Sequence, residues 1–284
     1  MKLYLFITGS KGLFGKVLIN FLKKKKIKFQ TLNRKKNKKY NQNYFEKILK
    51  LYDFTHIINL AAYTNVDQSE KNKKHVDELN INFLEHICNA INKSKKDIKL
   101  IHFSTDQMYY DHKLNSEKNK KVVNYYTKSK IKSEEISKNI NSLVFRTNFF
   151  GKSLSKNRLS FSDWIYKNLK KKQKIFLAED LYFSPLSMHT LSEIIFKILH
   201  SKKTGVYNLG STEGKSRYEF GIEFSKILNL DLNYINKVKM KELKLSAKRN
   251  KDMRMNIKKF ERDFKIKLPS LKKEIAKESK NYEK

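Results

Sequence analysis

The segment Ile7-Thr8-Gly9-Ser10-Lys11-Gly12-Leu13-Phe14-Gly15 decides the fold of this chain, because it places three of the eight glycines within seven residues. The apolar run 3–7 leads into it and is typical of a buried parallel strand, while apolar residues follow it at helical spacing. This context favours a dinucleotide-binding loop over an ordinary strand-to-helix turn. Gly9 would permit the tight turn, Gly12 the approach of a pyrophosphate, and Gly15 close packing of helix and strand.

Strand and helix patterns alternate through the first half of the chain. Further strands are expected over 28–32, 56–60, 98–103 and 143–145, with helices around 45–51, 79–91 and 126–137. The alternation predicts an α/β fold with a Rossmann-type, doubly wound parallel sheet. The pattern loosens after Gly151. We therefore expect a dinucleotide-binding domain over 1–150 and a smaller, mainly substrate-binding lobe over 151–284, parts of which return to the sheet.

The amino-acid composition limits which kinds of binding partner are expected. The formal charge is +35, but 56 of the 63 basic residues are lysine and seven are arginine. Because arginine is the preferred reader of base edges, nucleic acid is not the expected partner beyond non-specific, salt-sensitive adhesion. With a single cysteine, Cys88, no intramolecular disulfide can form, and no run of 18 apolar residues exists. We expect a cytoplasmic protein without a membrane span.

A Tyr-x-x-x-Lys pair supplies the candidate chemistry. In a helix, Tyr126 and Lys130 share a face, and the lysine charge is expected to lower the pKa of the tyrosine. The chain has three such pairs, as many as chance predicts, and only Tyr126 opens the helix between the fourth and fifth expected strands. Thr105, at the end of the fourth strand, could hold a reacting carbonyl oxygen. These three residues are the predicted catalytic set.

Taken together, these motifs resemble those of the extended short-chain dehydrogenases/reductases, and most closely those of the dTDP-4-dehydrorhamnose reductase family. The resemblance covers nearly the whole chain. Its pieces are the glycine segment, Asn59–Glu70 with Ala61-Ala62-Tyr63-Thr64-Asn65-Val66-Asp67, Ser104-Thr105-Asp106, Tyr126 to Lys130, Phe145-Arg146-Thr147, Phe183-Ser184-Pro185 and Arg249–Met253. It implies NADPH-dependent reduction of the 4-keto group of a nucleotide-linked 6-deoxy sugar, in the synthesis of cell-surface polysaccharide precursors.

The resemblance also implies a set of binding residues. Those for the cofactor are Gly9, Lys11, Gly12, Leu13, Phe14, Gly15, Asn33, Arg34, Ala61, Ala62, Tyr63, Asn80 and Lys130. Those for the sugar nucleotide are Val66, Asp67, Gln68, Thr105, Asp106, Phe149 and Arg249. Asp67 has a second interpretation as a helix cap. Arg146 is interpreted first as a structural ion-pair partner, with a role in substrate binding as the alternative. The resemblance leaves a homodimer open. No metal is expected, because Lys16 stands where family members with a bridging metal have a carboxylate.

Cofactor preference and reaction type follow from single residues. No carboxylate follows the second strand, where Asn33 and Arg34 stand, so NADPH is favoured, with NADH as the alternative. Related 4,6-dehydratases follow the threonine with Asp-Glu, whereas Gln107 cannot ionise, which favours simple reduction. Two other functions stay open: a nucleotide-sugar epimerase on the same fold, and a non-catalytic, cofactor-binding regulatory subunit.

Overall fold

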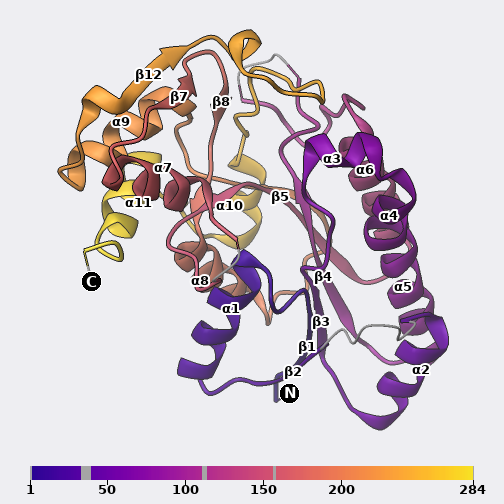
Figure 1. The fold of residues 1–284 in the computed structure, drawn as a ribbon. Coiled ribbons are helices and arrows are strands. Elements are labelled where there is room, and N and C mark those ends of the chain that lie inside the picture. The colour runs from indigo at the N-terminus through magenta and orange to yellow at the C-terminus, as the bar shows by residue number, and fades with distance from the viewer. Residues whose placement is uncertain (1, 33–39, 111–113, 156–157, 284) are drawn as a thin grey trace.

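A six-stranded parallel sheet forms the centre of the molecule (Figure 1). The computed structural model describes residues 2–32, 40–110, 114–155 and 158–283. The strand order is β10-β5-β4-β3-β1-β2, so the chain reverses direction across the sheet between β1 and β3. The strands are β1 (Tyr4–Thr8), β2 (Lys28–Thr31), β3 (His56–Asn59), β4 (Lys99–Thr105), β5 (Ser142–Thr147) and β10 (Gly205–Leu209). This arrangement confirms the predicted α/β, Rossmann-type fold.

Helices cover both faces of the sheet. One face carries α1 (Leu13–Lys24), α8 (Met188–Ile198) and α10 (Lys258–Phe264), and the other carries α2 (Gln42–Leu51), α5 (Phe83–Ser94) and α6 (Tyr125–Ser137). Alternate side chains of β1 divide between the two cores: Leu5 and Ile7 pack with α1 and α8, whereas Phe6 packs with α2 and α5. Two short helices, α3 (Val66–Lys71) and α4 (Lys73–Asp77), and a π-helical turn (Glu78–Asn82) precede α5.

The second lobe has its own apolar cluster and small paired strands. Its parallel pairs are β7 (Ile175–Ala178) with β12 (Ile235–Val238), and β6 (Phe149–Phe150) with β9 (Leu186–Ser187); β8 (Tyr182–Phe183) pairs antiparallel with β11 (Lys215–Ser216). The helices α7 (Phe161–Lys170), α9 (Arg217–Ile227) and α11 (Leu271–Ser279) pack around them, and short 3₁₀ turns lie at Leu232–Tyr234 and Met240–Glu242. Because α8 and β10 return to the large sheet, the chain crosses between the two regions several times.

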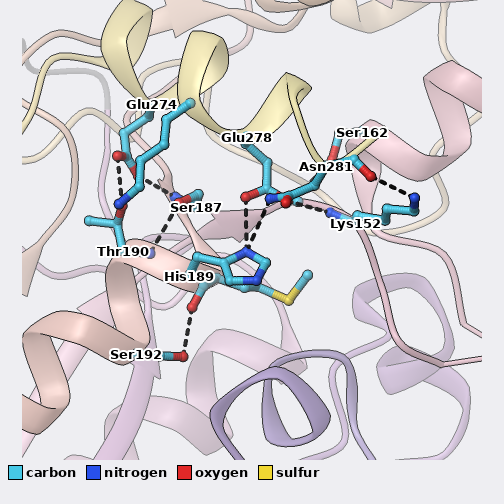
Figure 2. Close-up of polar contacts among 12 residues, drawn as sticks. Lys152, Ser162, Ser187, His189, Thr190, Ser192, Glu274, Glu278 and Asn281 are labelled. Atoms are coloured by element: carbon cyan, nitrogen blue, oxygen red, sulfur yellow. Dashed lines mark hydrogen bonds and ion pairs between the residues drawn. The ribbon is translucent and has the colours of Figure 1, made fainter. Parts of the chain in front are cut away.

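The C-terminal helix α11 fastens this lobe to the start of α8 (Figure 2). The carboxylate of Glu274 is buried and accepts hydrogen bonds from the Ser187 amide at 2.6 Å and the Thr190 hydroxyl at 2.8 Å. One turn later, Glu278 accepts the Lys152 amide at 2.8 Å and lies 3.1 Å from Nδ1 of His189. The segment that follows β6 is thereby held in place, and Phe149 of β6 lines the cavity described below.

A buried ion pair joins α6 to the sheet. Arg146 of β5 binds Glu134 of α6 through two parallel hydrogen bonds, 2.9 Å from Nε and 2.7 Å from Nη2. The Ser104 hydroxyl of β4 donates to the same carboxylate at 2.5 Å, and Arg146 also donates to the hydroxyl of Tyr109. Both charged side chains are at most 2% exposed. The interpretation of Arg146 as a structural ion-pair partner is therefore confirmed.

The substitution Glu134→Gln should destabilise the fold strongly. The amide side chain would fill the same space but leave the buried Arg146 guanidinium without its counter-charge, at a cost of about 3–5 kcal/mol. Urea denaturation followed by circular dichroism measures this. Glu135→Gln is the matched control, because the carboxylate of Glu135, next to Glu134 in the sequence, is exposed and its ion pairs are long. Equal losses of stability in the two variants would contradict the prediction.

Candidate active site

A cavity of about 380 Å³ opens at the carboxyl ends of the sheet strands, where the sheet meets the second lobe. The turn between β1 and α1 forms one wall, with Gly9, Gly12, Leu13, Phe14 and Gly15 all lining it. Ligands of doubly wound sheets bind at this edge, beside the point where the strand order reverses. The predicted glycine loop therefore borders this cavity.

Backbone geometry explains two of these glycines. Gly9 has φ +65°, a conformation that L side chains rarely adopt, and an added Cβ would overlap the backbone of Leu60 and Ala61. A Cβ on Gly15 would overlap the carbonyl oxygen of Gly9. The loop is fixed further by Thr8, whose hydroxyl donates to Asn59 at 2.5 Å and accepts the Ala61 amide at 3.3 Å.

The three predicted catalytic residues line the same cavity. Thr105 ends β4, and Tyr126 and Lys130 lie one turn apart on α6, all three buried. Asn124 caps α6, accepting the Thr127 amide at 2.8 Å, which sets where the helix begins and hence which way Tyr126 faces. Tyr166 of the competing pairs lies on α7, and Tyr109 is buried against Asn208 and Arg146. Neither lines the cavity.

The electrostatics of the pair differ from the sequence-based expectation. Burial raises the pKa of Tyr126 to about 12, and the group that lowers it is the Thr105 hydroxyl, through a hydrogen bond. The Lys130 ammonium is directed elsewhere: Nζ donates to the carbonyl of Phe103 at 2.7 Å and lies 3.4 Å from Nε2 of His102. The expected lowering of the Tyr126 pKa by Lys130 is therefore not seen. Burial lowers the pKa of Lys130 itself to about 8.

Asp106 places a second titratable group in the cavity. Burial raises the pKa of its carboxyl to about 6, opposed by a 2.9 Å hydrogen bond from the Asn148 amide and by the charge of Arg217. Gln107, the residue that departs from the dehydratase pattern, lies beside it, with Nε2 at 3.4 Å from Oδ1 of Asp106. Asp106 and Gln107 both line the cavity.

Asp67 does not line the cavity and does not cap α3. Asn65 is the cap residue, accepting the Gln68 amide at 3.0 Å. The Asp67 carboxylate instead binds Arg249 at 2.7 and 3.0 Å and accepts the Ala247 amide at 2.8 Å. Arg249 does line the cavity. The cap interpretation of Asp67 is therefore wrong, because the cap position lies two residues earlier, and the contact of Asp67 with substrate stays a prediction.

The remaining predicted binding residues fall into three groups. Ala62, Val66 and Phe149 line the cavity. Lys11, Ala61, Tyr63, Gln68 and Asn80 do not; of these, Asn80 is buried and holds the Tyr63 backbone, accepting its amide at 2.7 Å and donating to its carbonyl at 3.2 Å. Asn33 and Arg34 lie outside the described residues.

Several lining residues were missed by sequence reasoning. Thr147 ends β5 and Asn148 follows it, so the same strand-end argument that selected Thr105 would have found them. Leu60, Thr64 and Ser104 lie within motifs quoted above but were not selected as binding residues, and Phe103 directly precedes one of those motifs. No local signal marks Arg158 or Arg217, which reach the cavity from the second lobe.

The described residues contain neither a membrane span nor a metal-ligand cluster. No helix in this part of the chain is both long and apolar enough to cross a membrane. Among the same residues, no three histidine, cysteine, aspartate or glutamate side chains are grouped as metal ligands.

Comparison with known proteins agrees with this geometry. The family model described as RmlD substrate binding domain matches residues 1–283. A Haloferax volcanii protein named "probable low-salt glycan biosynthesis reductase Agl14" is 21% identical, with 96% of each chain covered. The dTDP-4-dehydrorhamnose reductase of Salmonella typhimurium is 24% identical over 75% of each chain. The predicted family is confirmed, and the predicted oxidoreductase class agrees with the names of these relatives.

A solved structure shares the fold over the full chain length. The dTDP-4-dehydrorhamnose reductase of Bacillus anthracis, crystallised in complex with NADP, superposes with a TM-score of 0.90 at 23% identity, covering 99% of this chain and 100% of that one.

The Asp106 carboxyl should titrate near pH 6, well above the ordinary value of 3.8. Carboxyl ¹³C shifts of aspartate-labelled protein measure this, with Asp106→Asn identifying the signal. Asn148→Leu should raise the midpoint further, because it removes a hydrogen bond that favours the ionised form of Asp106. Since the folded-state pKa is raised, this group favours folding below pH 3.8 and loses that contribution as the pH rises through 6. A midpoint near the ordinary value would contradict the prediction.

Proposed function

The chain belongs to the RmlD substrate binding domain family, and from this premise we propose that it uses NADPH to reduce the 4-keto group of a nucleotide-linked 6-deoxy sugar. The observation that carries the proposal is the shared cavity: the glycine loop, Thr105, Tyr126 and Lys130 all line it. A cofactor loop and a proton-donating tyrosine that border one space are what a hydride-transfer enzyme requires.

The residues present fit a nicotinamide dinucleotide. Around the turn before α1, Gly12 brings the backbone to the cavity wall: an added Cβ there would approach only the Gly9 carbonyl oxygen, at 3.1 Å. The N-terminus of α1 offers amide groups to a pyrophosphate, and Lys130 would hold the nicotinamide ribose. When bound, the reduced cofactor supplies the hydride. NADP in the Bacillus anthracis relative supports NADPH, with NADH as the alternative.

Proton transfer is assigned to this chain's own residues. Tyr126 donates its phenolic proton to the oxygen of the keto group, and Thr105 orients that oxygen through its hydroxyl. Two directions of the Lys130 ammonium are taken by the Phe103 carbonyl and His102, so the ammonium is fixed while its side chain still borders the cavity. The group that stabilises negative charge on Tyr126 is instead the Thr105 hydroxyl, which leaves Lys130 the role of holding the nicotinamide ribose.

Reduction is favoured over elimination by the chemistry of the cavity. A dehydratase needs a second acid–base pair beside the tyrosine. Gln107 cannot ionise, and it contacts Asp106. An epimerase and a non-catalytic cofactor-binding subunit are the alternatives, and a turnover assay with NADPH and keto-sugar nucleotides separates them from a reductase. The Haloferax volcanii relative, named for glycan biosynthesis, supports a role in making precursors of cell-surface polysaccharide in the cytoplasm.

Tyr126→Phe should lower turnover about 10²–10⁴-fold, the usual contribution of a positioned general acid. NADPH affinity should stay close to that of the wild type, because the hydroxyl is assigned to the keto oxygen. The loss of NADPH absorbance measures turnover, and fluorescence titration measures the affinity.

Tyr125→Phe is the matched control for this substitution. The hydroxyl of Tyr125 donates to Asp77 of the neighbouring helix α4 at 2.7 Å, and Tyr125 does not line the cavity. Its loss should leave turnover unchanged. Full activity in Tyr126→Phe, or an inactive Tyr125→Phe, would contradict the assigned helix face.

NADPH should bind at least about tenfold more tightly than NADH, which corresponds to about 1.4 kcal/mol. No carboxylate follows β2 to accept ribose hydroxyls, and Arg34 and Lys11 offer positive charge to a 2′-phosphate. Calorimetric titration at physiological salt measures both constants. Arg34→Ala should reduce the preference, whereas Lys47→Ala, on α2, should not; equal constants for the two cofactors in the wild type would contradict the prediction.

A further inference from the structure

Arginine is concentrated in the cavity of an otherwise lysine-rich chain. The sequence contains seven arginines and 56 lysines. Three of the seven arginines line the cavity: Arg158, Arg217 and Arg249. Among the described residues, Lys130 is the one lysine that lines it. A planar guanidinium presents paired donors that match the oxygens of phosphate or carboxylate, which an ammonium cannot do. This distribution indicates a cavity built to receive an anionic group.

The three arginines are not equivalent. Arg249 is neutralised by Asp67, with Nη2 at 2.7 Å from the carboxylate. Within the described part of the chain, Arg217 and Arg158 have no carboxylate within ion-pair distance. Arg158 is exposed, whereas Arg217 is partly buried. Arg217 is therefore the cation whose burial most requires a partner.

Two aromatic rings hold the Arg217 guanidinium in place. Its central carbon lies 3.7 Å from the ring centre of Phe183 and 4.5 Å from that of Phe161. Stacking contacts of this kind stabilise the cation but leave its in-plane N–H donors free. Burial lowers the pKa of Arg217 to about 10, opposed by the Asp106 charge, so the side chain remains cationic at neutral pH.

The backbone that carries Arg217 is equally fixed. Ser216 caps α9 and forms a reciprocal capping box with Glu219. The Arg217 amide donates to the Leu181 carbonyl at 3.0 Å, and the preceding strand β11 pairs with β8, which contains Phe183. The guanidinium and the ring beneath it thus belong to one paired unit. Little conformational entropy would be lost when this side chain binds a ligand.

We propose that Arg217 binds a phosphate group of the nucleotide part of the substrate, with Arg158 as a second cation at the exposed side of the cavity. The proposal rests on the proposed function for the identity of the ligand. Two arginines without carboxylate partners match the two negative charges of a nucleoside diphosphate better than the single charge of a sugar carboxylate. Both come from the second lobe, whereas the glycine loop assigned to the cofactor comes from β1 and α1.

Binding measurements test this without any turnover. Isothermal titration of the wild type with dTDP, UDP and GDP, each compared with its nucleoside, identifies the diphosphate that binds best. Arg217→Gln should weaken that diphosphate about 10–100-fold, the range for losing hydrogen bonds to a charged group. The affinity for the matching nucleoside and for NADPH should stay close to the wild-type values. Arg217→Lys, which keeps the charge but not the paired donors, should give an intermediate loss.

Arg262→Gln is the matched control, because Arg262 is exposed and pairs with Asp263 on α10. It should leave diphosphate affinity unchanged. Thermal unfolding confirms that each variant is folded; if Arg217→Gln is not, Arg217→Lys decides, with a clear loss of diphosphate affinity required.

Three results would overturn the proposal. The first is a wild type that binds no diphosphate more tightly than its nucleoside. The second is unchanged diphosphate affinity in folded Arg217→Gln or Arg217→Lys. The third is found by titrating the same variants with glucuronate, a sugar carboxylate: if Arg217→Gln and Arg217→Lys weaken the binding of glucuronate and not that of the diphosphate, Arg217 binds a sugar carboxylate. Absence of keto-sugar reduction with intact, Arg217-dependent diphosphate binding would instead reject the proposed reaction and leave this site standing.

Discussion

The ion pair between Arg146 and Glu134 is the contact on which the site geometry depends. It joins β5 to α6 inside the protein, and the Ser104 hydroxyl of β4 donates to the same carboxylate. Tyr126 and Lys130 lie on α6 two turns and one turn before Glu134, so the position of this carboxylate sets the height and rotation of both relative to Thr105. Removing two charges from water is costly, and paired donors with good geometry are needed to offset that cost. A buried pair at this point favours one register of helix against sheet.

A chain of buried polar groups extends the same constraint to the glycine loop. Lys130 contacts His102, His102 contacts Asn59, and Asn59 accepts the Thr8 hydroxyl immediately before Gly9. Burial and the nearby Lys130 charge both lower the pKa of His102, so the imidazole is neutral at physiological pH. Lys130, one turn from the proposed proton donor on α6, is thus connected to the proposed cofactor loop through buried side chains. Such an arrangement holds the reacting groups without reorganisation during the reaction.

Local sequence patterns were sufficient for the sheet and for most of the site. The glycine turn, Thr105 at a strand end and the Tyr126 helix each depend on residues within a few positions of one another, so periodicity and spacing predict them. The partner of Asp67 is Arg249, 182 positions away, and no local pattern indicates that pairing. Arg217 was missed for the same reason: it stands among ordinary helix-start residues, and only the folded lobe brings its charge near Asp106. The pKa of Tyr126 could not be predicted from its spacing to Lys130, because the direction of the ammonium depends on the Phe103 carbonyl.

The proposed catalytic residues and the cavity arginines Arg158 and Arg217 come from different parts of the chain. The catalytic residues come from β4 of the large sheet and from α6, which packs on that sheet, whereas Arg158 and Arg217 come from the lobe. The two regions must therefore be held together for the site to exist. Several contacts between distant segments do this: Asp67 with Arg249, Asn124 with the Lys248 carbonyl at 2.8 Å, and Glu274 of α11 with the Thr190 hydroxyl of α8 at 2.8 Å. The return of α8 and β10 to the sheet adds backbone connections to these side-chain contacts. Because the lobe supplies Arg217 and Arg158 but none of the three proposed catalytic residues, changes in the lobe can alter which substrate is bound while the chemistry at Tyr126 stays the same.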